Sequence, residues 1–312
     1  MRSAGPGERG SAPRPVRTWR GSEGDLTLES LFFTTFDGLR IAASAAGDSE
    51  APMVVLLHGG GQTRHAWAGA VRHLAGAGYR ALSLDLRGHG ESDWSPDGDY
   101  HPEVFAGDLA SILRQIDKPV VLVGASMGGA SAIRAMAHHG AENVVALVLV
   151  DIVPKPAREG VRKVTQFMMR NLDGFKNLEE VADAVAAYNP NRPRPSDVNG
   201  LRKNLREGED GRFYWHWDPK LLSMGDSEDK LDRMEHETAL AMEKIAAPCL
   251  LVRGGESDVV DEAVMEDFKR RVRRLEVCEV RGAGHMVAGD KNDSFNDAVI
   301  AFLARHLPVP SS

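Results

Sequence analysis

The chain is short of cysteine, of aromatic residues and of long apolar runs, and each shortage excludes a class of protein. Two cysteines among 312 residues exclude a small domain stapled by disulfides. No run of 18 apolar residues is present, so the sequence predicts no membrane span. Aromatic residues make up only 6%, but hydrophobic residues reach 42%, which excludes a disordered chain and allows one large core or two modest ones.

An excess of positive charge is also missing. The formal net charge is −7 and the 38 basic residues are dispersed, so we expect no nucleic-acid partner. No cluster of Cys, His or carboxylate residues has metal-ligand spacing, and we expect neither a metal nor a cofactor. Cys249 and Cys278 both lie in apolar runs, which favours buried core thiols and a cytoplasmic protein.

The first residues form a segment of their own. Arginines stand among Gly, Ser and Pro without the apolar stretch of a signal peptide. We expect a disordered tail over residues 1–27. An organellar transit peptide is the alternative interpretation, although the segment has no amphipathic pattern.

Short apolar runs rich in Val and Leu recur along the chain, with helical stretches between them. Continuous runs of this kind are typical of parallel strands buried on both faces. The sequence predicts a doubly wound α/β fold with strands at 53–57, 79–84, 119–123, 144–150, 249–252 and 275–280. Helices are expected at 63–77, 103–116, 126–139 and 292–306. Asp37-Gly38, a dipeptide favoured in tight turns, separates the runs 28–36 and 39–45 and predicts an opening hairpin.

From Pro154 to Glu243 the strand signal disappears and helical patterns take over. One predicted helix spans 178–188, where Asn177 and Glu180 have capping-box spacing. We therefore expect a core formed by residues 28–153 and 244–312, with an inserted helical block at 154–243. The sequence does not indicate which oligomeric state the protein has.

The motif Gly124-Ala125-Ser126-Met127-Gly128 follows a predicted strand and precedes a predicted helix. A serine on such a sharp turn needs neighbours without bulky side chains, and the two glycines meet that need. A dinucleotide-binding or phosphate-binding turn would require glycine patterns that the chain lacks. We therefore predict that Ser126 is a nucleophile.

A serine nucleophile needs a histidine that takes its proton and a carboxylate that orients the histidine. His285 lies in a glycine-rich loop after the last predicted strand, at the edge of the sheet where ligands bind. Asp258 follows the strand before it and keeps the order Ser, Asp, His. Asp151, directly after the strand at 144–150, is an open alternative to Asp258, and Glu256 is a weaker one.

Acyl transfer also needs donors for the developing oxyanion, usually two backbone N–H groups. Met127, the residue after the nucleophile, is predicted to supply one. Three glycines, 59–61, follow the strand at 53–57 and let the backbone approach a ligand closely. We predict Gly60 as the second donor.

Four segments together carry a family resemblance: 57–60, 85–92, 123–129 and 282–286. With them the chain, over about residues 30 to 310, resembles the α/β-hydrolase superfamily of serine hydrolases, and in particular its esterase, haloperoxidase and epoxide-hydrolase-like branches. The resemblance implies a mostly parallel eight-stranded sheet and identifies the insertion at 154–243 as a cap. It also implies that Asp85 and Arg87 brace a loop. Ser126 stands where epoxide hydrolases carry aspartate, which argues against epoxide chemistry.

The expected function is a cofactor-free hydrolase of a small-molecule ester, thioester or lactone with an apolar acyl or ring portion. Carbon-carbon bond hydrolysis and perhydrolase or haloperoxidase chemistry use the same residues and stay open. A hydrolase-fold ligand sensor is the alternative from another class. For the pocket wall we predict Trp215, Trp217 and Met168, with a core for the cap as the rival role of these aromatic residues.

Overall fold

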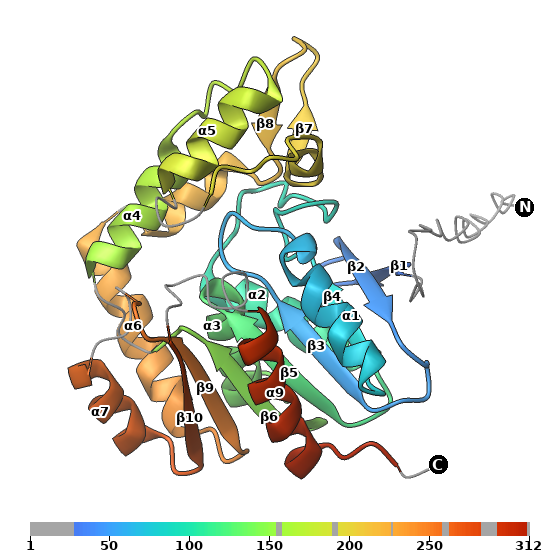
Figure 1. The fold of residues 1–312 in the computed structure, drawn as a ribbon. Helices are drawn as coiled ribbons and strands as arrows, with labels where there is room; N and C mark the ends of the chain where they lie inside the picture. The colour runs from blue at the N-terminus through green and yellow to red at the C-terminus, as the bar shows by residue number, and fades with distance from the viewer. Residues whose placement is uncertain are drawn as a thin grey trace, which may run out of the picture.

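A single large sheet organises the structure, which is a computed structural model that describes residues 28–153, 158–188, 193–225, 227–257, 262–281 and 292–310. The sheet has eight strands in the order β1-β2-β4-β3-β5-β6-β9-β10 (Figure 1). Their bounds are β1 Glu29–Thr34, β2 Arg40–Ala46, β3 Met53–Leu57, β4 Arg80–Leu84, β5 Val120–Ala125, β6 Val144–Val150, β9 Cys249–Gly254 and β10 Leu275–Val280. The predicted strands are confirmed, with small changes at their ends.

The antiparallel pairs lie at one end of the sheet. β1 pairs with β2 and β2 with β4 in antiparallel register, and the remaining neighbours are parallel. The hairpin predicted at Asp37-Gly38 is present, and Gly38 has a φ of +88°, a conformation that favours glycine. The mostly parallel α/β sheet expected from the sequence is therefore confirmed.

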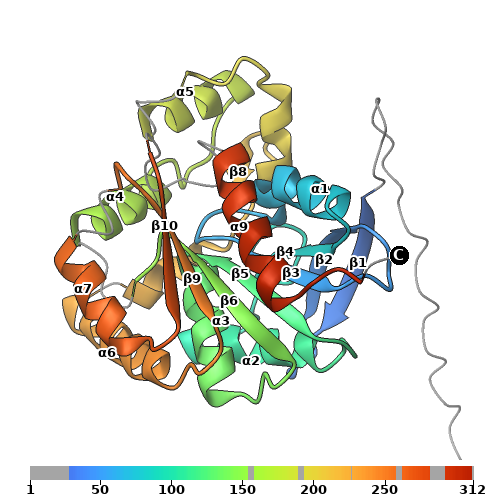
Figure 2. The same ribbon diagram turned by 60° about the horizontal axis from the view of Figure 1, so that its bottom comes forward.

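Helices cover both faces of the sheet (Figure 2). α1 and α9 pack on one face, and α2, α3, α6 and α7 on the other. Alternate residues of one strand face opposite layers: Val54 packs in the apolar cluster that contains α1 and α9, and Val55 packs in the cluster on the other face. The bounds are η1 Arg64–Trp67, α1 Ala68–Gly76, α2 Pro102–Leu113, α3 Met127–His138, α6 Glu228–Glu243, α7 Glu262–Arg271 and α9 Asn292–His306.

The chain between β6 and β9 is called the insertion below; the part before α6 stands above the sheet in Figure 1, and α6 lies beside the sheet. Before α6 it contains α4 Arg158–Met169, α5 Leu178–Tyr188, η2 Asn199–Asn204, β7 Leu205–Glu207, β8 Phe213–Trp215 and η3 Pro219–Gly225. α5 begins as predicted, because the Glu180 N–H donates to Asn177 Oδ1 at 3.0 Å. The prediction of a purely helical block is wrong, since β7 and β8 form a two-stranded antiparallel sheet. Strands of three residues are too short to show an alternating pattern.

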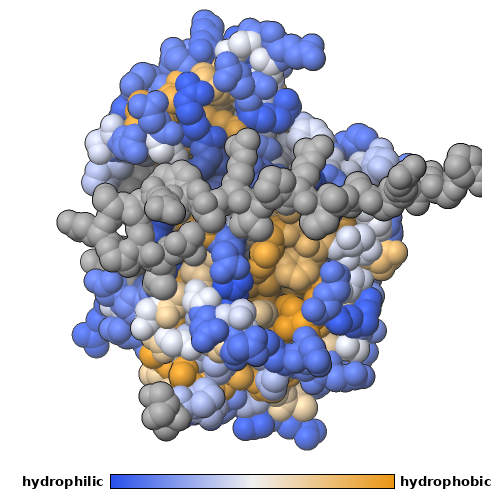
Figure 3. All heavy atoms as spheres, turned by 90° about the vertical axis from the view of Figure 1, so that its right-hand side faces the viewer, coloured by the Kyte–Doolittle hydropathy of each residue, from blue (hydrophilic) through white to orange (hydrophobic). Residues whose placement is uncertain are grey.

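β1 is an edge strand, and Figure 3 views the molecule from its side. Apolar atoms gather on this face below the polar surface of the insertion (Figure 3). Phe32 and Phe36 are 51% and 59% exposed. The Arg40 guanidinium lies over the Phe32 ring and the Arg87 guanidinium lies over the Phe36 ring, so each of these aromatic rings contacts a cation.

Candidate active site

Ser126 occupies a strained turn between β5 and α3. Its φ is 46° and its ψ is −118°, a conformation that non-glycine residues rarely adopt. A Cβ on Gly124 would lie 2.6 Å from the Gly129 backbone, and a Cβ on Gly128 would lie 2.5 Å from the Leu57 carbonyl oxygen. The two glycines of the motif therefore have the packing role expected from the sequence.

The turn directs Ser126 into a cavity of about 270 Å³. Met127 is the first residue of α3, so its N–H has no partner within the helix. The positive end of the helix dipole points the same way and favours negative charge at this place. Gly60, Ser126 and Met127 all line the cavity.

The loop after β3 brings its glycines to the serine. A Cβ on Gly59 would lie 3.4 Å from Ser126 Cβ. The Gly59 N–H donates to Gln62 Oε1 at 3.0 Å and the Gly61 N–H donates to His89 Nε2 at 3.1 Å. Among the described residues the Gly60 N–H makes no hydrogen bond, so it is the donor of this loop that is left for a ligand.

Two histidines beside this loop are fully buried. Burial lowers the pKa of His58 to about 4 and that of His89 to about 3. Both imidazoles are therefore neutral at neutral pH. Each ring bonds a carbonyl oxygen through Nδ1 and accepts a backbone N–H at Nε2. Neither role was predicted from the sequence.

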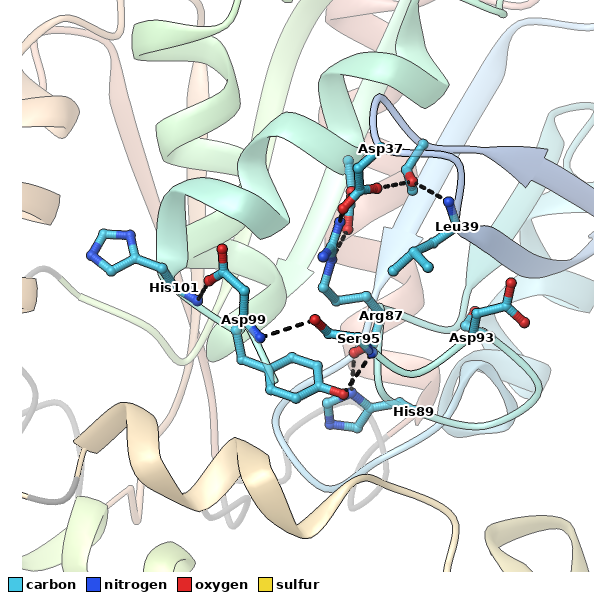
Figure 4. A network of polar contacts seen from close by, with 12 residues as sticks. Asp37, Leu39, Arg87, His89, Asp93, Ser95, Asp99 and His101 are labelled. Atoms are coloured by element: carbon cyan, nitrogen blue, oxygen red, sulfur yellow. Dashed lines mark hydrogen bonds and ion pairs between the residues drawn. The ribbon is translucent and has the colours of Figure 1, made fainter. Parts of the chain in front are cut away.

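The turn after β4 is braced by buried charges. Asp85 accepts the N–H of Arg64 at 2.6 Å and that of Glu91 at 3.0 Å, and it pairs with the Arg64 guanidinium. Arg87 donates to both oxygens of Asp108 at 2.6 Å. It also reaches Asp37 at 2.8 Å, and His89 lies in the same loop (Figure 4). These contacts agree with the bracing role that the family resemblance implies.

Asp151 is a buried carboxylate at the end of β6, with a φ of 47°. It accepts the Gly254 N–H at 3.1 Å and the Ser257 hydroxyl at 2.5 Å, and it lines the same cavity as Ser126. Asp258 and His285, the predicted acid and base, lie outside the described residues. Glu256 is exposed in the turn after β9. The structure thus brings Asp151 and Ser126 to one cavity.

The sequence profile of the alpha/beta hydrolase family matches residues 54–298, which is more than half of the chain. This chain belongs to the alpha/beta hydrolase family. An esterase of Mycobacterium tuberculosis is 32% identical over 248 residues, 77% of this chain and 79% of that protein. Its solved structure matches with a TM-score of 0.71 at 30% identity and covers 90% of this chain and 93% of that one.

A second relative is an sn-1-specific diacylglycerol lipase of Mus musculus, 32% identical over 268 residues, 83% of each chain. A solved E-2-(acetamidomethylene)succinate hydrolase has a TM-score of 0.77 over 88% of this chain and 99% of its own. At 22% identity that likeness shows the fold alone. The fold is therefore the alpha/beta-hydrolase fold, and both sequence relatives carry names of ester-bond hydrolases.

The cavity of this family member is mostly apolar on the side of the insertion. Met168 of α4 lines it and lies over the glycine loop, with Sδ 3.9 Å from a Cβ built on Gly60. The remaining lining residues are His89, Pro102, Phe105, Ala130, Ser131, Asp151, Ile152, Val153, Gly160, Val164, Thr165, Leu221, Leu222, Met224, Leu231, Met234, Glu235 and Thr238. Met168 is the predicted wall residue that the structure brings to Ser126.

Trp215 and Trp217 do not line this cavity, so the structure corrects their predicted place in its wall. Trp215 packs edge-on against Phe175, in the small core of the insertion. Trp217 is 4% exposed and belongs to the main core, where its backbone pairs with His89. Trp215 thus has the rival role weighed from the sequence, a place in the core of the insertion, whereas Trp217 packs in the main core.

The described part of the chain holds neither a metal-binding cluster nor a membrane-spanning helix. Within the described ranges, no group of three or more His, Cys, Asp or Glu residues has the geometry to hold a metal ion. No helix in the described part of the chain is long and apolar enough to cross a membrane. Cys249 is buried and Cys278 half-buried, and burial raises the pKa of both thiols.

Proposed function

We propose that the protein is a serine hydrolase that cleaves carboxylic esters through an acyl-enzyme. The observation that carries the proposal is the strained Ser126, which faces a cavity beside the unbonded N–H of Gly60. A serine held on such a turn, with backbone donors in reach, fits acyl transfer. The relatives named as an esterase and a lipase support the same class of reaction.

The proposed reaction has two halves. Ser126 Oγ attacks the carbonyl carbon while His285 takes the hydroxyl proton, and the Gly60 and Met127 N–H groups bind the oxyanion. The carbon-oxygen bond then breaks, and the alcohol leaves with the proton from His285. In the second half His285 deprotonates a water molecule, which attacks the acyl carbon. The bond from that carbon to Ser126 Oγ then breaks, the acid leaves, and His285 returns the proton to Oγ.

The proposed acid that orients His285 is Asp258, with Asp151 as the alternative. The Asp151 carboxylate already holds the Gly254 N–H and the Ser257 hydroxyl, which suits a residue that ties β6 to the turn after β9. Asp258→Asn should therefore lower kcat by about 10⁴-fold, and Asp151→Asn should cost much less. The reverse order of losses would move the acid to Asp151.

The insertion is proposed to act as a cap, within predicted bounds of 154–243, that selects the acyl group. α4, η3 and α6 contribute half of the described lining residues, and most of the residues that they contribute are apolar. The acidic lining residues among those described are Asp151 and Glu235, the second of which pairs with Arg158 at 2.8 Å, and no Lys or Arg lines this part of the cavity. Because like charges cost several kcal/mol across a buried contact, the proposed substrate has an uncharged, apolar acyl group.

A matched pair of substrates tests the acyl preference. p-Nitrophenyl hexanoate and the mono-p-nitrophenyl ester of adipic acid have six-carbon acyl groups and differ in a terminal carboxylate. We expect kcat/KM to favour the hexanoate at least about tenfold, and Glu235→Gln to narrow the ratio. Equal rates on the two esters would contradict the proposed substrate class.

The reaction class itself is tested by hydrolysis of p-nitrophenyl esters with acyl chains of two to twelve carbons. Ser126→Ala should lower kcat/KM by about 10⁴-fold or more. Ser111→Ala, a buried serine on α2 outside the cavity lining, is the matched control and should keep the wild-type rate. Ester hydrolysis that survives Ser126→Ala would contradict the proposal.

A further inference from the structure

The proposed oxyanion donor sits in the least constrained kind of backbone, a run of three glycines. Glycine loses more conformational freedom on ordering than any other residue, so three in succession have little intrinsic preference for one geometry. A donor must nevertheless point at the oxyanion before the reaction begins if it is to stabilise the transition state. Some other group has to fix the direction of the Gly60 N–H.

Two planar peptide units meet at Gly60, and each is held by one buried histidine. The first unit joins the Gly59 carbonyl to the Gly60 N–H, and a trans peptide points these two groups in opposite directions. The Gly59 carbonyl oxygen lies 2.8 Å from His58 Nδ1 and accepts the Gln62 N–H at 3.2 Å. Holding this oxygen on one side directs the Gly60 N–H to the other.

The second unit joins the Gly60 carbonyl to the Gly61 N–H. His89 Nε2 accepts that N–H at 3.1 Å, while His89 Nδ1 lies 3.0 Å from the Arg87 carbonyl oxygen. For His58 the two nitrogens exchange segments: Nδ1 bonds the glycine loop, and Nε2 accepts the Leu86 N–H of the turn after β4 at 3.0 Å. Each ring therefore connects the glycine loop to the turn after β4.

We propose that His58 and His89 are positioning residues, which lock the peptide planes on either side of Gly60 and so aim its N–H at the substrate carbonyl. The inference rests on the proposed function, because it assigns these residues to the oxyanion donor of that reaction. Neither histidine exchanges a proton with the substrate. Each acts through one backbone hydrogen bond.

The protonation state of the rings fits this role. The Nδ1–H bonds to carbonyl oxygens fix the tautomer and leave Nε2 as an acceptor, which a protonated imidazole lacks. Both rings are fully buried with centroids 4.9 Å apart, and burial favours the neutral form of each. A charge on one ring would also repel a charge on the other.

The turn that carries His89 is itself held in place by hydrogen bonds to the insertion, so the position of the His89 ring is fixed. The Gly90 N–H donates to the His216 carbonyl at 2.6 Å, and the Asp218 N–H donates to the Gly88 carbonyl at 2.8 Å. The Tyr100 hydroxyl donates to Asp218 Oδ2 at 2.6 Å. The insertion thus holds the same turn whose histidine holds the glycine loop.

The test compares three variants with the wild-type enzyme in p-nitrophenyl ester hydrolysis. His89→Leu removes the acceptor, and His89→Gln can place its Oε1 near the position of Nε2 and restore it. His216→Leu is the matched control, since Nδ1 of that imidazole has no hydrogen-bond partner among the described residues. We expect His89→Leu to lower kcat about 100-fold with KM changed less than about threefold. His89→Gln should recover most of the loss, and His216→Leu should keep the wild-type kcat.

A second readout separates positioning from general loss of structure. A thionoester carries C=S in place of C=O, and sulfur accepts hydrogen bonds weakly, so two N–H donors stabilise its transition state less. The wild-type enzyme should prefer the ester to its thiono analogue, and His89→Leu should reduce that preference about tenfold or more. A variant that is merely less stable would lose both rates equally, and its thermal midpoint would report it.

The outcomes are distinct for the inference and for the function beneath it. If the wild-type protein hydrolyses esters, a folded His89→Leu variant with an unchanged kcat would overturn the positioning role. An unchanged preference of that variant for the ester over its thiono analogue would overturn it as well. An equal loss in His216→Leu would do the same. A wild-type protein that hydrolyses no ester would overturn the proposed function. At His58, Asn keeps a donor near the Nδ1 position, so His58→Asn should retain more kcat than His58→Leu.

Discussion

The two sides of the cavity are built in different ways. On the side of the sheet, the loops after β3 and β4 carry buried polar groups whose hydrogen bonds join segments about thirty residues apart, such as the pair of His89 and Gly61. On the side of the insertion, α4, η3 and α6 present mainly Leu, Met and Val side chains. Polar contacts fix direction, whereas apolar contacts tolerate change.

This difference separates the control of chemistry from the control of substrate size. A buried polar group left without its partner costs about 1 to 3 kcal/mol, so small displacements on the sheet side are expensive. Apolar walls can be enlarged or reduced at a smaller cost in activity. Changes on the sheet side should therefore lower kcat, and changes on the insertion side should alter the choice of acyl chain.

The largest expected effect comes from the packing of the serine turn. In Gly128→Ala, the new Cβ would lie 2.5 Å from the Leu57 carbonyl oxygen and 2.7 Å from that of His58, so the backbone of β3 or of α3 has to move. We expect kcat/KM to fall at least about 100-fold and the free energy of unfolding to fall by about 3 kcal/mol. Ester kinetics and urea unfolding measure the two effects.

Gly76→Ala is the control for that change. Gly76 ends α1, and a Cβ there would meet nothing within 4 Å. This substitution should keep the wild-type kcat and stabilise the protein by up to about 1 kcal/mol. A Gly128→Ala enzyme with the same kinetics and stability as Gly76→Ala would remove the claim that close packing fixes the serine turn.

The next effect concerns the pH dependence of stability. The pKa values of His58 and His89, about 4 and about 3 in the folded protein, are lower than the ordinary value of 6.5. As pH falls below 6.5 the unfolded chain binds protons at these rings and the folded chain does not. Each ring should thus lower the free energy of unfolding by up to about 1.4 kcal/mol per pH unit, down to pH 4 for His58 and pH 3 for His89.

Urea unfolding between pH 7 and pH 4 measures this dependence, and His89→Leu should make it shallower by about one proton. His306→Leu is a control, because that half-buried ring lies near Glu276 at the end of α9, far along the chain from the loop. If the slope of the unfolding free energy against pH is the same in His89→Leu as in the wild type, the neutral, buried state of His89 is contradicted. The difference between the two sides of the cavity would then lose this support.

The smallest effect is expected on the insertion side. Met168→Ala removes a side chain that lies over the glycine loop and should shift the optimal acyl chain by two or more carbons, with ratios of kcat/KM changing about tenfold. Trp215→Phe keeps an aromatic ring in the core of the insertion and should leave the chain-length profile unchanged. A shifted chain-length profile in Trp215→Phe, together with an unchanged one in Met168→Ala, would indicate that Trp215 and not Met168 lines the substrate pocket.

The sheet and the serine turn could be predicted because their signals are local. Continuous apolar runs mark buried parallel strands, and Gly124, Ser126 and Gly128 form a motif within five residues. The role of Gly60 as a candidate donor also followed from its position after a strand. In each case neighbouring residues carry the whole signal, and the structure adds only the distances.

The remaining features depend on contacts between distant segments. Nothing near Trp215 in the chain says whether its ring faces a substrate or Phe175, and the three-residue strands β7 and β8 become visible only through their pairing. The backbone N–H groups that His58 and His89 accept at Nε2 lie 28 residues away. One signal was available: both histidines follow predicted strands that end at the same edge of the sheet, next to glycines.

The central claim is that Ser126 is the nucleophile, and a fluorophosphonate probe tests it most directly. The probe reacts with serines that are activated and placed beside oxyanion donors. We predict one labelled peptide that contains the adduct on Ser126, no labelling of Ser126→Ala, and loss of esterase activity in proportion to labelling. An adduct on another serine, or full esterase activity in an enzyme labelled at Ser126, would contradict the account.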